Sequence, residues 1–180
     1  MVVFTQLSNG KVCVTHHRGK RQDDPLKMSQ LSDELQEEVD RLCALGDAHA
    51  DLSRFPEALG LYWEAWDLLP EPKIACSAAT WILAAVGDAN FLGRDYEAGR
   101  DNLSTVMHCP GGIGIPFLHM RLGQCQYELG DHANAADELV RAFLDGGEDL
   151  FDDEDPKYLD FVETNLQRAD ANKKAWHFWR

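Results

Sequence analysis

The sequence predicts an all-α protein in which helical hairpins stack side by side. From Leu31 onward, apolar residues recur at three- and four-residue spacing, which is typical of amphipathic helices packed on a core. Glycines lie inside this helical pattern at positions 46, 87 and 123, and a similar order of small and bulky apolar residues surrounds each one. Such repetition at a period of about 20–50 residues is typical of a solenoid. We therefore expect a helical solenoid of three hairpins.

The first predicted hairpin joins a helix over about 32–52 to a helix over 55–69. Ser32 suits the position before a helix, because its hydroxyl can accept a hydrogen bond from a backbone N–H, and two acidic residues follow it in the first turn. Pro56 suits the first turn of the second helix, where its missing N–H removes no hydrogen bond. Pro70 then ends that helix.

Two further hairpins and a last helix follow. Longer linkers, EPKIACSA and the Gly/Pro-rich CPGGIGIP, separate the three hairpins. After the third hairpin comes an acidic run, GGEDLFDDEDP, and then a helical pattern, PKYLDFVETNLQRA. An open stack needs such a capping helix over the face that no further repeat buries. We expect the aromatic tail KKAWHFWR to pack against the stack rather than to lie in solvent.

The N-terminal segment differs from the rest of the chain. VVFTQL and KVCVT are β-prone runs separated by Asn9-Gly10, the dipeptide that a tight hairpin turn prefers. A lone hairpin is marginal in water, so this segment either docks on the main body or is a poorly ordered leader. We divide the chain into an N-terminal extension (1–27), a solenoid domain (28–168) and a C-terminal tail (169–180).

Charge and composition disfavour several classes of function. The 180 residues carry a formal net charge of -14, and residues 28–180, with 12 basic and 29 acidic residues, carry -17, so nucleic acid is an unfavourable partner. Five scattered cysteines fit neither a disulfide framework nor a zinc ribbon, which favours a reducing compartment. No apolar run approaches the roughly 20 residues that span a bilayer, and the start lacks a signal-peptide pattern. We expect a soluble cytoplasmic protein that contacts no membrane.

The residues around the three glycines follow a known signature, W-x2-L-G-x2-Y, then A-x3-F, then P, over about 34 residues. The first unit matches it at Leu42, Leu45, Gly46, His49, Ala58, Tyr62, Ala65 and Pro70. The second unit is the weaker match, with Leu83, Val86, Gly87, Asn90, Gly99 and Leu103. The third unit matches clearly but lacks the closing proline, with His119, Leu122, Gly123, Gln126, Ala135, Leu139 and Ala142. Over 31–168 the chain thus resembles the tetratricopeptide-repeat (TPR) family, which implies a right-handed superhelix that holds another polypeptide.

Two narrower resemblances suggest what kind of polypeptide is held. The run GDANF…DYEAGRDNLSTVMHCPGGIGIPFLHMRLGQCQYELG, followed by AADEL and EDPKY, resembles small bacterial TPR proteins found near polymorphic toxin genes. That resemblance implies an immunity or adaptor role. The length and layout are also similar to the acidic three-repeat chaperones of type III secretion, although these motifs are not shared. Both resemblances imply stoichiometric binding of a partner protein.

Stacked hairpins form a concave face that is lined by the first helix of each hairpin. We expect the exposed residues of these helices to bind the partner: Asp40, Asp47, Asp51, Trp81, Asp88, Phe91, Phe117, Met120, Gln124, Tyr127 and Glu128. Carboxylates interleaved with aromatic and Met side chains favour a partner segment that is both basic and apolar. The TPR clamp for acidic C-terminal peptides needs Lys, Asn and Arg on this face, and Asp at positions 47 and 88 disfavours such a ligand. The alternatives are that Trp81, Phe91 and Leu92 are buried against neighbouring helices or covered by the N-terminal segment, and that the carboxylates form a solvated face.

A catalytic or metal-dependent protein is the rival hypothesis from another class. The metal-like groupings are His16-His17, His108-Cys109, and His119 with Cys125, and none has the paired spacing of a helix-borne site. Neither a nucleophile elbow nor a P-loop is present, and PGGIGIP lacks the preceding strand of a dinucleotide-binding turn. We therefore expect no cofactor, no metal and no enzymatic activity.

Overall fold

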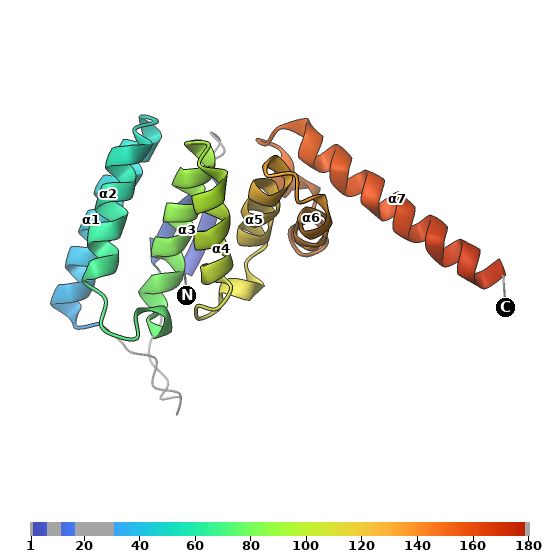
Figure 1. Cartoon of the computed structure of the whole chain (residues 1–180). Coiled ribbons are helices and arrows are strands. Elements are labelled where there is room, and N and C mark those ends of the chain that lie inside the picture. The colour runs from blue at the N-terminus through green and yellow to red at the C-terminus, as the bar shows by residue number, and fades with distance from the viewer. Residues whose placement is uncertain (1, 7–11, 17–30, 179–180) are drawn as a thin grey trace, which may run out of the picture.

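The structure is a computed structural model that describes residues 2–6, 12–16 and 31–178. Seven α-helices dominate the described residues, and the first six form three successive hairpins (Figure 1). The hairpins pair α1 (Asp33–Asp51) with α2 (Phe55–Asp67), α3 (Ser77–Leu92) with α4 (Tyr96–Val106), and α5 (Pro116–Glu128) with α6 (His132–Gly146). The last helix is α7 (Pro156–Phe178), and short 3-10 turns lie in the linkers at η1 (Lys73–Ala75), η2 (Gly112–Gly114) and η3 (Glu148–Phe151). This architecture confirms the predicted helical solenoid with its capping helix.

The helix boundaries follow from capping residues in the sequence. The Ser32 side chain accepts a hydrogen bond from the Leu35 N–H at 3.3 Å and so opens α1. Asp95 and Asp131 cap α4 and α6 in the same way. Helix α2 ends at Asp67, two residues before the predicted end. There the backbone changes to the hydrogen bonds of a 3-10 turn, which join residues three apart, and the first runs from the Leu68 N–H to the Ala65 carbonyl.

Close approach of the paired helices explains the three helical glycines. A Cβ atom on Gly87 would lie 2.5 Å from Leu103 Cγ, and one on Gly123 would lie 2.7 Å from Leu139 Cγ. A Cβ atom on Gly46 would overlap the Tyr62 ring. These distances are below normal van der Waals contact, so the glycines are needed for packing and not for flexibility.

Each hairpin builds its core in the same register. The second helix buries three residues that follow the glycine of its own hairpin by 12, 16 and 19 positions. They are Ala58, Tyr62 and Ala65 in α2, Gly99, Leu103 and Val106 in α4, and Ala135, Leu139 and Ala142 in α6. The buried positions are thus the same in all three hairpins, so the second hairpin, which matches the sequence signature least well, is a full structural repeat.

The hairpins stack in chain order, and one end of the chain leaves the stack. Helix α2 packs on α3, α4 on α5, and α6 on α7, while α3 also contacts α1 and α5. Helix α7 packs on α6 near its start and then runs away from the other helices (Figure 1). The expectation that the aromatic tail packs on the stack concerns side chains at 173–180 that lie outside the described ones, so it stays a prediction. None of the described helices is long and apolar enough to cross a membrane.

The expected N-terminal hairpin is present as two paired strands. Strand β1 (Val2–Gln6) pairs antiparallel with β2 (Val12–His16), in a register that joins Val2 to His16 and Gln6 to Val12. The Asn9-Gly10 turn between them and the segment 17–30 lie outside the described residues. Whether the extension 1–27 acts with the solenoid stays a prediction.

Candidate functional site

The first helices of the three hairpins, α1, α3 and α5, line one face of the stack, which we call the inner face. All the residues expected to bind a partner lie on these helices. Burial divides them into three groups. Asp40 and Asp51 are exposed, and Trp81, Phe117, Met120 and Gln124 are buried. The remaining residues are half-buried, and they are Asp47, Asp88, Phe91, Tyr127 and Glu128.

The expectation that the four buried residues are exposed is wrong. Trp81 and Phe117 are 5% exposed, and Met120 and Gln124 are 0% exposed. The reason is their place in the middle of the stack, because α3 contacts α1, α2, α4 and α5, and α5 contacts α3, α4 and α6. Side chains that would line a groove in a more open stack become core here. The alternative weighed from the sequence, burial of Trp81, Phe91 and Leu92, therefore holds for Trp81, while Phe91 and Leu92 are half-buried.

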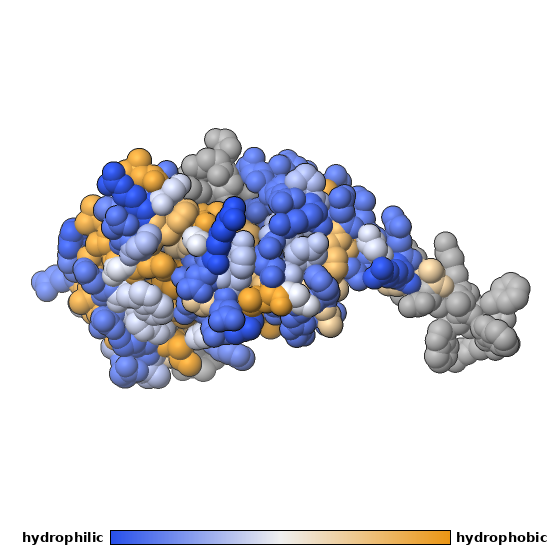
Figure 2. Space-filling model, turned by 45° about the horizontal axis from the view of Figure 1, so that its top comes forward, coloured by the Kyte–Doolittle hydropathy of each residue, from blue (hydrophilic) through white to orange (hydrophobic). Residues whose placement is uncertain are grey.

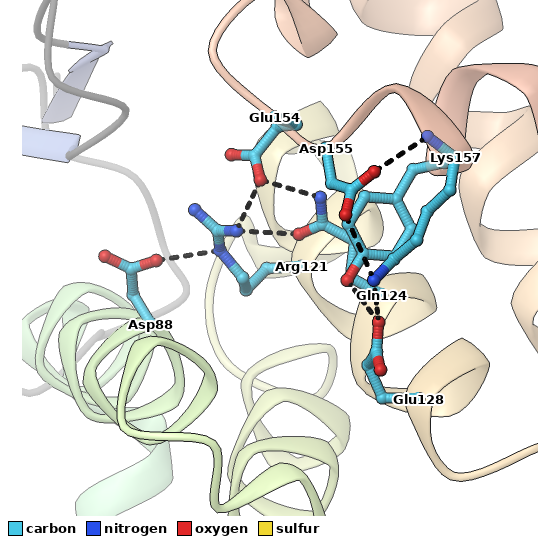
Figure 3. Close-up of polar contacts among 8 residues, drawn as sticks. Asp88, Arg121, Gln124, Glu128, Glu154, Asp155 and Lys157 are labelled. Carbon is cyan, nitrogen blue, oxygen red and sulfur yellow. Dashed lines mark hydrogen bonds and ion pairs between the residues drawn. The ribbon is translucent and has the colours of Figure 1, made fainter.

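A buried arginine, Arg121, bonds to residues of neighbouring elements in the C-terminal half of the inner face (Figure 3). Arg121 is 0% exposed, and its Nε forms an ion pair with Asp88 Oδ1 of α3 at 2.7 Å. Its Nη1 donates to Glu154 Oε2, just before α7, at 3.0 Å and to Gln124 Oε1 at 2.7 Å. Gln124 Nε2 donates in turn to the same Glu154 oxygen at 2.9 Å. We call these four residues the Arg121 network, and it ties the second hairpin, the third hairpin and the approach to α7 together.

Aromatic rings complete the surroundings of the guanidinium group. The Arg121 Cζ atom lies 4.4 Å from the centroid of the Phe91 ring and 5.1 Å from that of Phe117, within the range of a cation–π contact. Burial alone lowers the pKa of Arg121, but attraction by Asp88 and Glu154 raises it above its ordinary value. The buried cation is thus matched by two carboxylates, and Asp88 is engaged inside the protein rather than free for a partner.

The pair Tyr127 and Glu128 is also used internally, to hold α7. Glu128 Oε1 accepts hydrogen bonds from the Tyr158 hydroxyl at 2.6 Å and from Lys157 Nζ at 2.8 Å. Partial burial tends to raise the pKa of Glu128, but these two donors hold it below its ordinary value. The Tyr127 ring packs edge-on against Tyr158 and Phe161, with centroids 5.5 and 5.0 Å apart. These contacts hold the first turns of α7 against the end of α5.

Carboxylates gather at the N-terminal end of the inner face, and we call Asp40, Asp47, Asp51 and Asp88 the acidic patch. Asp47 Oδ1 accepts a hydrogen bond from the Tyr62 hydroxyl at 2.7 Å. Burial raises the pKa of Asp47, and although that bond lowers it, repulsion by Asp51 and Asp88 adds to the rise. The net pKa of Asp47 lies above its ordinary value, mainly because the carboxyl group is partly buried.

Exposed apolar side chains lie at the same end of the stack. Leu45 and Leu52, in and after α1, are 43% and 64% exposed, and Ile74 in the following linker is 44% exposed. In Figure 2, apolar surface gathers at the left, where Figure 1 places α1 and α2, while hydrophilic residues cover much of the remaining face in view. The N-terminal end of the stack therefore combines acidic and apolar surface.

His119 and Cys125, one of the pairs considered for chemistry, are held within the fold. No group of three or more His, Cys, Asp or Glu side chains among the described residues is arranged to hold a metal ion. Burial raises the pKa of Cys125 to about 12, and burial also raises the pKa of Cys43, so both thiols stay protonated at neutral pH. His119 Nδ1 lies 2.5 Å from Glu138 Oε2, and its Nε2 lies 2.8 Å from the Ile113 carbonyl oxygen. Both ring nitrogens of His119 are thus engaged within the fold.

His119 makes stability depend on pH. Both of its partners are acceptors, so both contacts are hydrogen bonds only when the imidazole carries two protons. The bond to Glu138 raises the pKa of His119 above 6.5, and the nearby Arg141 opposes this rise. Its stabilisation is therefore complete below about pH 6.5 and is lost as the pH rises through the folded-state value.

We expect urea unfolding of the wild type to lose on the order of 1–2 kcal/mol from this contact between about pH 6 and pH 9. A His119→Gln variant removes the titrating group and should lack that part of the pH dependence. An identical pH profile in the variant would contradict the assignment.

Comparisons with known proteins identify the fold. No known family model matches the sequence, and no curated protein matches it. Among solved structures, the chain is similar to the Sgt2 TPR domain from Aspergillus fumigatus, with 16% identity and a TM-score of 0.55 over 76% of this chain and 82% of that one. It is also similar to the crystal structure of MamA, with 16% identity and a TM-score of 0.53 over 77% of this chain and 82% of that one. At this identity the likeness establishes a TPR-like fold.

Proposed function

We propose that the protein is a non-enzymatic binding module that holds a basic, partly apolar segment of another protein at the N-terminal end of its inner face. The observation that carries this proposal is the acidic patch, most of which lies on one flank of α1, with exposed Leu45 and Leu52 roughly a third of a turn further around the same helix. Stacked helical hairpins present extended surfaces that suit a bound polypeptide, so the TPR-like fold supports a binding role.

Electrostatics favours a cationic ligand over an anionic one. Burial is the main cause of the raised pKa of Asp47, and repulsion by Asp51 and Asp88 adds to it, so several carboxylates lie close together here although Asp88 is paired with Arg121. A Lys or Arg side chain would relieve this repulsion, while a carboxylate would increase it. A segment that also wraps around α1 would bring its apolar side chains to Leu45 and Leu52, which lie roughly a third of a turn from the aspartates of that helix. Acidic peptides and nucleic acid are disfavoured by the same argument.

The biological role that we propose is that of an immunity or adaptor protein, which blocks or shields a cognate protein. A secretion chaperone is the alternative within the same physical class. Both roles place the protein in the cytoplasm, and the described cysteines, which are free thiols, support a reducing compartment. An adjacent toxin gene would support the immunity role, and adjacent translocator genes would support the chaperone role.

The test is a double charge reversal, Asp40→Lys with Asp51→Lys. Both residues are exposed, and Asp40 accepts a hydrogen bond from Gln36 Nε2 at 2.7 Å on the surface of α1. Asp47 and Asp88 are half-buried and bonded to Tyr62 and Arg121, so their reversal would also disturb the fold. We expect the variant to bind a Lys/Trp-containing peptide about tenfold or more weakly, with a shallower dependence on salt, in a calorimetric titration. Circular dichroism should show unchanged helical content.

The matched control reverses two exposed carboxylates in η3, Glu148→Lys with Asp149→Lys. This change alters the net charge equally but lies at the other end of the stack, so the peptide affinity should fall much less. Equal affinities for the wild type and the Asp40/Asp51 variant would overturn the proposed site.

A further inference from the structure

Helix α7 extends well beyond the surface that it caps. Its 23 residues span about 34 Å, and among its described side chains the packed ones lie in the first half, with Tyr158 and Val162 buried and Leu166 half-buried. Arg168 is already exposed, and Figure 1 shows the helix continuing away from α6 to its end. The part from position 167 to Phe178 therefore projects by about 18 Å. A helical segment of this length is marginal when it stands alone in water, so its persistence favours a docking partner.

The projecting segment has the charge opposite to that of the body. Residues 167–180 hold four basic residues and one acidic residue, a net charge of +3, whereas residues 28–166 hold eight basic and 28 acidic residues, a net charge of -20. Three aromatic residues, Trp176, Phe178 and Trp179, follow Lys173 and Lys174 within the same stretch. This stretch therefore carries the positive charge that the acidic patch favours, together with apolar side chains.

The projecting end of α7 can reach the acidic patch of another molecule but not that of its own chain. The acidic patch lies mainly on α1, at one end of the stack, while α7 leaves the opposite end and points away from it (Figure 1). The chain's own patch is therefore out of reach of its continuous α7. A second copy presents the same patch with no such restriction, and a contact between two different surfaces of identical chains joins them head to tail.

We propose that residues 167–180 of one copy dock on the acidic patch of a second copy, so that the chain is its own ligand when no other partner is bound. This inference rests on the proposed function, because it uses the same patch for a ligand of the same chemistry. It also predicts competition, since a basic segment of another protein would displace the tail and dissociate the assembly.

Light scattering on the full chain at rising protein concentration tests the inference. We expect the wild-type mass to rise above the 20.2 kDa of one chain. Reversal of the tail charges, Lys173→Glu with Lys174→Glu, or of the patch, Asp40→Lys with Asp51→Lys, should weaken self-association about tenfold or more. The quadruple variant should associate again, because the swapped charges attract, and this recovery excludes misfolding as the cause of the losses.

Three outcomes would overturn the inference: a wild-type mass of one chain at every concentration, an unchanged mass in the tail variant, or a quadruple variant that stays monomeric. Failure here is distinguishable from failure of the proposed function. A tail variant that self-associates like the wild type, together with a patch variant that loses the Lys/Trp peptide, would remove the self-ligand and leave the binding site in place.

Discussion

Replacement of Arg121 by Met is expected to lower the free energy of unfolding by about 3–5 kcal/mol. Met roughly fills the space of the aliphatic part of the Arg121 side chain. It leaves Asp88 and Glu154, whose side chains are 14% and 8% exposed, without their cation. Two mutually repelling carboxylates in a buried setting cost far more than a lost surface ion pair. Urea unfolding of the wild type and the variant at neutral pH measures the difference.

The control for this prediction removes the stranded charges as well. Asp88→Asn with Glu154→Gln in the Arg121→Met background should recover a large part of the lost stability, because a neutral set of similar shape needs no buried cation. A loss below about 1 kcal/mol in the single variant, as for a surface pair, would show that water reaches the carboxylates and that Arg121 does not hold the hairpins together.

Gly46→Ala should destabilise the first hairpin by about 1–3 kcal/mol, although alanine favours a helix over glycine. The added methyl group would overlap the Tyr62 ring, with Cδ1 at 2.7 Å, and the ring cannot withdraw freely because its hydroxyl bonds Asp47. The helices would have to separate or the ring would have to leave its rotamer. Thermal unfolding monitored by circular dichroism reports the effect as a lower Tm.

Gly60→Ala is the matched control for the packing argument. Gly60 also lies inside a helix, α2, but a Cβ atom there meets no atom within 4 Å. The same substitution should therefore stabilise the protein by about 0.5–1 kcal/mol through the lower entropy of the unfolded chain and better helix propensity. If both variants shift the Tm in the same direction, close helix packing is not the reason for the glycine at position 46.

The repeat architecture was accessible from the sequence because it depends on local rules. Ser32 and Asp95 mark helix starts by their capping chemistry, and Gly46 and Gly87 mark the points of closest approach. These signals lie within one hairpin, so a single sequence is enough to find them. The direction of α7 was not accessible, because nothing local distinguishes a helix that folds over its stack from one that projects beyond it.

The inner face was predicted less well because its exposure depends on contacts between hairpins. Phe117 and Met120 have the spacing of groove residues, but neighbouring helices bury them. Arg121 was missed, although one signal was available. It is the only Lys or Arg residue of α5 and lies among apolar neighbours. A buried cation in such a helix needs anionic partners, such as Asp88 and Glu154.

The most direct test of the proposed binding surface is carbodiimide cross-linking of the Lys/Trp peptide to the protein, followed by mass spectrometry of the joined fragments. An amide bond forms only where a peptide amine lies against a carboxylate, so each cross-link reports a contact. We expect cross-links at Asp40 and Asp51, and we expect excess salt to suppress them. Cross-links confined to the acidic run at 148–155, with none on α1, would contradict the account.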